Sequence, residues 1–291
     1  MKDRNTNAAV LSSRSSEVRK RRGDSAGKMC SFFVAAACAF LNAHANGGRC
    51  ESYEATVSLP IDCGFFSEPI IPLAIASNGN VGGYFRNCAN GEDRAMIWQV
   101  GGSTVTNLHV WGPDDRSYTQ GVNRSGVAVG YVSPFSGPAR AFARLNGVVQ
   151  ELPLPRGTAD SAAEDVNDQG IVVGWFNPTI STPPKACRWV NEQIEVLNVQ
   201  GKYSAYAEHI NDDGDICGFK TIEVNGSASE MGFLWKDGIA TDLGIIPDGL
   251  SSRSSSINNH DEIVGSGILS INRNFIATDR AFYWSEKTGM V

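Results

Sequence analysis

One short pattern recurs five times along this chain: a β-branched residue, usually followed by Asn, then a polar turn, a small apolar run and Gly. The copies occupy residues 75–83, 122–130, 166–174, 210–218 and 257–265. Their turn positions, residues 79, 126, 170, 214 and 261, lie 47, 44, 44 and 47 residues apart. A fixed period of this length predicts one supersecondary unit that is repeated along the chain.

Each repeat divides into four short apolar pieces that are separated by turn-forming residues. The pieces are 160–167, 171–176, 185–190 and 194–197 in the third repeat, and 205–211, 215–220, 232–236 and 240–243 in the fourth. Such short stretches, in a chain with 31 Gly and only 19% charged residues, predict antiparallel strands rather than helices. We therefore expect an all-β fold, a β-propeller of about five four-stranded blades.

The two ends of the repeat region suggest how such a ring closes. The fifth repeat reaches the last residue at the start of its fourth strand, and residues 53–60 resemble a fourth strand, that of residues 148–153. This N-terminal strand is expected to supply the missing outer strand, so that the ring closes and no sheet edge stays open. A truncated chain or an open array is the alternative.

The turn between the first two strands of a repeat gives the strongest local signal. Residues 167–170 and 211–214 place Asn first and Gly last, which predicts a hairpin built on a type I turn. Asp212, Asp213 and Asp215 also suggest calcium, but they lack the ligand spacing of an EF-hand loop, so we expect no metal site. A Trp ends the third strand of four repeats and is expected to pack between repeats: Trp98, Trp189, Trp235 and Trp284.

Residues 1–45 are predicted to be a signal peptide, and residues 46–291 the propeller. The first 45 residues carry eight Lys/Arg and three Asp/Glu, then an apolar core at 30–41 and an Ala43-His44-Ala45 cleavage pattern. This core is shorter than the ~20 residues that span a bilayer, so no transmembrane span is expected in the mature chain. An uncleaved anchor, a lipoprotein acylation site at Cys38 and a twin-arginine signal are the alternatives.

The charge of the mature chain limits its partners. Residues 46–291 contain 17 basic and 28 acidic residues, a net charge of −11. An acidic body of this kind argues against nucleic acid and anionic membrane surfaces as partners.

Five cysteines follow the signal peptide. Cys187 and Cys217 replace apolar residues inside repeat strands, so we expect buried free thiols there. One disulfide is expected among Cys50, Cys63 and Cys88, with the pairing left open. No CxxC or Cys/His metal spacing is present, which argues against a structural zinc site.

The repeats resemble the bacterial extracellular HAF-repeat family, whose pattern runs roughly I-N-x-x-G-x-I-V-G, then H-A-F-L-W, then a strand ending in Leu. Residues 210–214 (Ile-Asn-Asp-Asp-Gly), 263–265 (Ile-Val-Gly) and 281–284 (Ala-Phe-Tyr-Trp), with their counterparts over residues 75–291, are similar to it. The resemblance implies export and a repeat β fold, and it implies no established enzymatic activity. The His of the family pattern is replaced in every repeat: Arg94, Arg140, Lys185, Met231 and Arg280.

An aromatic residue follows the Gly of the second strand in four repeats, and Ser266 is the exception. These four residues are expected near the rim with the longer, more variable connections, where binding sites usually form on a rigid scaffold. They would form a stacking surface for a sugar or a peptide, or alternatively pack between blades. The candidate binding residues are Tyr84, Tyr131, Trp175 and Phe219.

Signals for catalysis are few, and we assign no catalytic residue. The HExxH, GxSxG and phosphate-cradling motifs are absent from the sequence. The pairs Asp114-Asp115 and Glu164-Asp165 would suit a glycosidase, which needs two carboxylates, but we expect them to be exposed loop residues. The histidines are expected at turns or on the surface: His109, His209 and His260.

The sequence therefore favours a secreted or periplasmic, non-enzymatic binding scaffold without a cofactor, whose ligand is an unknown glycan or protein. A secreted carbohydrate-active hydrolase or lyase on a propeller is the main alternative. A surface-structural repeat protein without a small ligand is a third.

Overall fold

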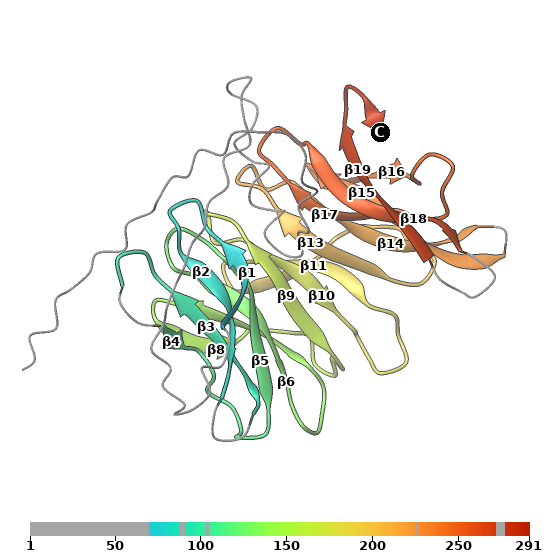
Figure 1. Cartoon of the computed structure of the whole chain (residues 1–291). Coiled ribbons are helices and arrows are strands. Elements are labelled where there is room, and N and C mark those ends of the chain that lie inside the picture. Colours follow the sequence, from blue (N-terminus) through green and yellow to red (C-terminus); the bar gives the residue numbers. More distant parts are fainter. Residues whose placement is uncertain (1–69, 88–90, 103–104, 225, 272–276) are drawn as a thin grey trace, which may run out of the picture. The chain divides into compact units, whose positions relative to one another are not determined.

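The computed structural model describes residues 70–87, 91–102, 105–224, 226–271 and 277–291 (Figure 1). All of them belong to the compact unit Leu59–Val291, and the other unit, Met1–Ser58, lies outside the described residues. The predicted signal peptide and Cys50, Cys63 and Cys88 also lie outside them. No helix within the described ranges has the length and apolar character needed to cross a membrane.

The described chain forms five four-stranded sheets, each with its strands in chain order. Neighbouring strands are antiparallel, so every repeat is a meander, as predicted. The strands are β1 (Ile70–Ile75), β2 (Val81–Arg86), β3 (Asp93–Trp98), β4 (Thr106–Asn107), β5 (Arg116–Val122), β6 (Ala128–Ser133), β7 (Arg140–Leu145), β8 (Val148–Glu151), β9 (Ser161–Val166), β10 (Val172–Phe176), β11 (Lys185–Val190), β12 (Gln193–Val196), β13 (Ala205–Ile210), β14 (Ile216–Val224), β15 (Ser227–Lys236), β16 (Ile239–Gly244), β17 (Arg253–Ile257), β18 (Ile263–Ile271), β19 (Ala277–Ser285) and β20 (Gly289–Met290).

One detail differs from the expected strands. In the fourth sheet β14 ends at Val224, after the expected residue 220, and β15 begins at Ser227, before the expected residue 232, so the two strands form a long hairpin in which Val224 pairs with Ser227. In the fifth sheet a fourth strand begins at Gly289, as expected, and this strand β20 pairs with β19 through Trp284 and Met290. Residues 53–60, expected to close the ring, lie outside the described residues.

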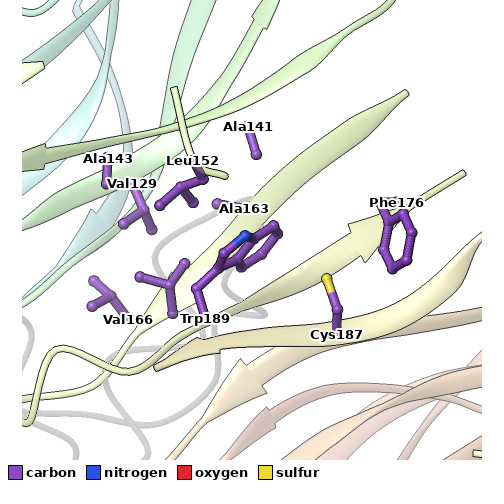
Figure 2. Packing of buried hydrophobic residues seen from close by; sticks show 10 residues of the cluster. Val129, Ala141, Ala143, Leu152, Ala163, Val166, Phe176, Cys187 and Trp189 are labelled. Carbon is purple, nitrogen blue, oxygen red and sulfur yellow. The ribbon is translucent and has the colours of Figure 1, made fainter. Parts of the chain in front are cut away.

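The hydrophobic core is divided among the interfaces between successive sheets. The first strands β1, β5, β9, β13 and β17 contact one another in that order. Figure 2 shows the cluster between the second and third sheets, where Val129 and Ala143 face Val166 and Trp189. Trp189 is buried and donates from Nε1 to the Pro153 carbonyl at 2.8 Å. Trp235 and Trp284 belong to the next two clusters, so the predicted packing between repeats is confirmed for Trp189, Trp235 and Trp284. Trp98, the fourth Trp of this prediction, is half-buried, belongs to none of the clusters and donates to the Gly102 carbonyl.

A β-bulge in every first strand explains the recurring Gly of the second strand. The pairing of β9 with β10 skips Glu164, since Ala163 pairs with Gly174 and Asp165 with Val173. A Cβ on Gly174 would lie 2.1 Å from the Ala162 carbonyl oxygen, so only Gly fits opposite the bulge. The skipped residues in the five sheets are Leu73, Gln120, Glu164, Glu208 and Ser255.

The predicted Asn-to-Gly turns are confirmed. Gly170, at φ +80°, donates its N–H to the Asn167 carbonyl at 3.0 Å, and the Asn167 Oδ1 accepts from the Ile171 N–H at 2.9 Å. Non-glycine Asp261 adopts the same left-handed conformation in the fifth sheet, at φ +58°. The Asn side chain thus closes its own turn through its oxygen.

The same Asn side chains join successive sheets through their nitrogens. Each Nδ2 donates to the carbonyl of the corresponding Asn in the next sheet: Asn123 to Asn167 at 2.9 Å, Asn167 to Asn211 at 3.0 Å, and Asn211 to Asn258 at 3.1 Å. Ala76 stands at this position in the first sheet, where Asn80 instead donates to the Asn123 carbonyl at 3.2 Å. We call this series of bonds the asparagine ladder.

Candidate functional site

The four candidate aromatic residues lie on second strands, beside the first strand of the following sheet. The Tyr84 ring contacts the Tyr118 ring at a centroid distance of 5.1 Å, and Trp175 contacts Tyr206 at 5.5 Å. Phe219 is only 4% exposed, so its role is packing. Tyr84, Tyr131 and Trp175 are half-buried and keep part of their rings accessible.

The structure divides these residues into two groups. The first is a tyrosine series in which Tyr118 lies between Tyr84 and Tyr131, at 5.1 and 5.2 Å from their ring centroids. The Tyr118 hydroxyl donates to the Asp93 Oδ2 at 3.0 Å. Burial, and then Asp93, raise the pKa of Tyr118, so the phenol stays neutral.

The second group lies on the third, fourth and fifth sheets. The Tyr206 ring stacks on Phe219, with centroids 4.7 Å apart and planes 16° apart. The Arg253 guanidinium lies 4.0 Å from the Phe219 centroid and donates from Nη2 to the Glu208 Oε1 at 3.0 Å. This arrangement holds the Glu208 carboxylate beside the aromatic residues of the neighbouring strand.

Glu164 is the residue whose environment sequence reasoning misjudged most. It is the bulged residue of β9, so the expectation of an exposed loop carboxylate is wrong. Its Oε1 accepts a hydrogen bond from the Trp175 Nε1 at 2.9 Å. Burial, reinforced by the charge of Glu208, raises the pKa of Glu164 to about 7.

Asp165 and His209 form a link between β9 and β13. The His209 Nδ1 lies 3.2 Å from the Asp165 Oδ2, which also accepts from the Ile210 N–H at 3.2 Å. Burial lowers the pKa of His209, but the hydrogen bond and charge of Asp165 outweigh it and the net shift is upward. His209 is thus a strand residue near the end of β13, and its side chain is 39% exposed, in agreement with the surface position that was expected.

The remaining candidates of the sequence have structural roles. Asp115 accepts from the Gly112 and Phe135 backbone N–H groups. The His109 ring nitrogens lie 2.8 Å from the Ser117 hydroxyl and 2.9 Å from the Gly112 carbonyl. His260 lies in a hairpin turn, as expected.

Cations and thiols also have clear positions. Lys236 lies between Asp215, at 3.1 Å, and Asp261, so of the three carboxylates considered for calcium Asp215 is paired with an ammonium group. Within the described ranges, no group of three or more His, Cys, Asp or Glu residues is arranged to hold a metal ion. Cys187 and Cys217 are buried free thiols, as predicted.

We call the second group, with Tyr131, the aromatic–acid row. Tyr131, the last residue of the tyrosine series, also belongs to it because β6, which carries Tyr131, packs against β9, which carries Glu164. The row combines half-buried aromatic residues with two carboxyl groups. The pKa of Glu164 is raised to about 7, and Glu208 accepts a hydrogen bond from Arg253. The members of the row are Tyr131, Glu164, Trp175, Tyr206, Glu208, Phe219 and Arg253.

Comparison with known proteins supports the fold. No family model and no curated protein sequence matches the chain. Among solved structures, TolB from Acinetobacter baumannii, a β-propeller protein, superimposes with a TM-score of 0.51 at 13% sequence identity. The match covers 77% of this chain and 53% of the TolB chain, so this chain spans about half of that structure. The five antiparallel sheets and this similarity together establish a β-propeller-like fold.

Proposed function

We propose that this protein is an exported, non-enzymatic β-propeller scaffold that binds a glycan at the aromatic–acid row. The observation that carries the proposal is the half-buried Trp175, whose indole N–H donates to Glu164 at 2.9 Å. This bond fixes the plane of the indole ring and places a carboxyl group at its edge. Sugar binding needs both parts, an apolar face for C–H groups and a planar polar group for hydroxyls.

The chemistry of the row favours a glycan over a nucleic acid or an anionic surface. The mature chain carries a net charge of −11, and Glu164 and Glu208 lie within the row. Carboxyl groups accept hydrogen bonds from sugar hydroxyls, and they repel phosphates. A protein ligand is the second partner that the exposed ring edges would suit.

Export is part of the proposal. The basic region, the apolar core and the Ala43-His44-Ala45 pattern support a secreted or periplasmic protein, and the repeat motifs support membership of the extracellular HAF-repeat family. N-terminal sequencing of protein recovered from the periplasm or the medium tests this, and the expected first residue is Asn46.

The binding proposal is tested by probing a glycan and polysaccharide array with the purified protein, with and without calcium. Saturable binding is expected, and Trp175→Ala should abolish it. Trp175→Phe keeps a ring but removes the N–H donor to Glu164, so it should weaken binding without abolishing it. Trp98→Phe is the matched control, since Trp98 lies outside the row and donates to the Gly102 carbonyl. Failure of folded Trp175→Ala to change binding would contradict the role of the row, and silence across the array would favour a protein ligand.

A carbohydrate-active hydrolase is the second candidate, and one observation favours it. Two carboxyl groups in the row have different environments: burial raises the pKa of Glu164 to about 7, while Glu208 accepts a hydrogen bond from the Arg253 Nη2 at 3.0 Å. Such a difference is typical of a general acid and its carboxylate partner. Release of reducing sugar from a bound glycan, lost in Glu164→Gln while binding persists, would establish this activity.

A further inference from the structure

The fourth and fifth sheets show how the aromatic–acid row holds a cation that belongs to the protein itself. Glu208 is the bulged residue of β13, and Phe219 follows the Gly of β14. The guanidinium of Arg253, the first residue of β17, lies 4.0 Å from the Phe219 centroid, and its Nη2 donates to the Glu208 Oε1 at 3.0 Å. An aromatic face and a carboxylate thus share one positive charge at this point of the row.

The same positions in the preceding repeat carry an aromatic ring and a carboxyl group, but a neutral residue replaces the arginine. Glu164 is the bulged residue of β9, and Trp175 follows the Gly of β10, as Phe219 does in β14. Tyr206 takes the position of Arg253, since each of these two residues precedes the one that pairs with the Gly of the second strand. This part of the row therefore has the aromatic and acidic groups of the next repeat without its cation.

The two rings of this part stand nearly at right angles beside the carboxyl group. The Trp175 and Tyr206 centroids are 5.5 Å apart, with the ring planes 73° apart. The Trp175 Nε1 donates to the Glu164 Oε1 at 2.9 Å, which places the carboxyl group at the edge of the indole ring. All three residues are half-buried, so each keeps some accessible surface. Aromatic rings that surround a site in this way are typical of cages that bind ammonium groups.

The charges near Glu164 also favour a cation. Within the described ranges no ion pair joins Glu164 to a basic side chain, because His209 pairs with Asp165 and Arg253 pairs with Glu208. Burial, and then the charge of Glu208, raise the pKa of Glu164 to about 7. A positive charge beside Glu164 would favour its ionised form and offset the repulsion between the two carboxylates.

We infer that Glu164, Trp175 and Tyr206 bind the ammonium group of an amino sugar, so that the ligand of the row is a glycan with free amines. The ligand then supplies the charge that Arg253 supplies in the next repeat. An N-acetylated sugar carries no charge and makes neither the cation–π contact nor the charged hydrogen bond. This inference rests on the proposed glycan binding and adds to it the class of sugar that is bound.

The test compares three probes of equal chain length by isothermal titration calorimetry of the full chain. The probes are an oligomer of glucosamine, an oligomer of N-acetylglucosamine and an oligomer of lysine. The glucosamine oligomer should bind about tenfold more tightly than the acetylated one, because acetylation removes the charge. Glu164→Gln keeps an acceptor for the Trp175 N–H but removes the carboxylate, so it should abolish this preference. Tyr206→Arg introduces the cation of the next repeat and should abolish the preference as well.

A matched control separates the site from the overall charge of the chain. Glu195→Gln changes the net charge by the same amount, but Glu195 lies outside the row and pairs with Arg188 at 2.7 Å, so the preference should persist. Circular dichroism confirms that each variant is folded, and Glu164→Gln, the closest in shape, decides if Tyr206→Arg is not.

The outcomes separate this inference from the proposal on which it rests. Equal affinity for the two sugars overturns the inference and leaves the proposed glycan binding intact. A preference for glucosamine that survives in Glu164→Gln also overturns it, because the charge of the whole chain would then explain the preference. Binding of the lysine oligomer without binding of either sugar overturns both proposals in favour of a protein ligand.

Discussion

The asparagine ladder predicts that the side-chain amide of a single Asn stabilises both a hairpin turn and the contact between two sheets. Asn167 is 4% exposed, and its side chain closes a turn through Oδ1 and links the third sheet to the fourth through Nδ2. In Asn167→Ala both bonds are lost. Asn258 makes the turn bonds to Glu262 and His260 but donates to no following sheet. Comparing Asn167→Ala with Asn258→Ala therefore sets the buried Nδ2 bond between two sheets against the Nδ2 bond that Asn258 makes to Glu262 within one turn.

The expected magnitudes follow from these bonds. A hydrogen bond contributes about 1 kcal/mol net, and a buried group left without its partner adds about 1–3 kcal/mol. Asn167→Ala leaves the Ile171 N–H without its acceptor and removes one donor from the Asn211 carbonyl, so we expect a loss of about 3 kcal/mol. Asn258→Ala, at a half-buried position, should cost about 1 kcal/mol.

Urea unfolding followed by tryptophan fluorescence measures this difference. Trp189 and Trp235 lie in the clusters on either side of the third sheet, so their emission reports on the affected interfaces. Asn167→Asp provides a second comparison, because it keeps the acceptor oxygens and replaces the donor by a carboxylate facing a carbonyl. Equal losses for Asn167→Ala and Asn258→Ala would refute the reasoning, since the bond between sheets would then contribute no more than the bond from Asn258 to Glu262 within one turn.

Three further predictions concern the bulge and the titrating groups. Gly174→Ala places a Cβ 2.1 Å from the Ala162 carbonyl oxygen and should lower the free energy of unfolding by about 3 kcal/mol. Gly170→Ala only strains a turn and should lower it by about 1 kcal/mol, so similar losses for the two variants in urea unfolding would contradict the prediction. Burial raises the pKa of Glu164 from 4.5 to about 7, so the unfolded chain loses this proton at a lower pH than the folded chain, and the free energy of unfolding falls as pH rises between those values. Glu164→Gln should remove about 2 kcal/mol of that fall, measured by urea unfolding across this pH range. Asp165 raises the pKa of His209 above 6.5 against the effect of burial, so stabilisation that is present below pH 6.5 is lost as pH rises through the pKa of His209 in the folded chain. His209→Gln should flatten this part of the plot of unfolding free energy against pH, and an unchanged plot would exclude the ion pair.

Much of the fold could be predicted because the repeat and its turn residues act locally. Lys185–Val190 was expected as a strand and is one, and the other strands of the third sheet agree within a residue or two. The long hairpin of β14 and β15 was missed because residues 221–231 are rich in polar side chains and correspond to a connection in the third repeat, and the alternation of Ile222 and Val224 with polar residues covers only four positions. Cross-strand pairing, which depends on neighbours distant in sequence, determines such an extension.

The candidate site was only half visible in the sequence. The aromatic residues were found because each follows a repeated Gly. Glu208 was missed, and Glu164 was named but expected in an exposed loop, because the bulged position carries Leu, Gln, Glu, Glu and Ser in the five sheets and so shows no recurring residue type. The available signal was the Gly itself, which recurs inside a strand, and such a Gly often marks a bulge. The ladder was missed for a similar reason, since the turn role of each Asn already accounted for it.

The division of the core among four interfaces has a consequence for the dynamics of the chain. Among the described residues each sheet packs on its sequence neighbours, so the second, third and fourth sheets each have two such interfaces, and the first and fifth have one. In such an array, local opening starts at the ends and moves inward. Amide hydrogen exchange should therefore be slowest in β9 and β10 and should quicken toward β1 and β19. The aromatic–acid row extends from the second sheet to the fifth, so its Trp175 half lies in the most rigid part of the molecule and its Arg253 end in a part that opens more often.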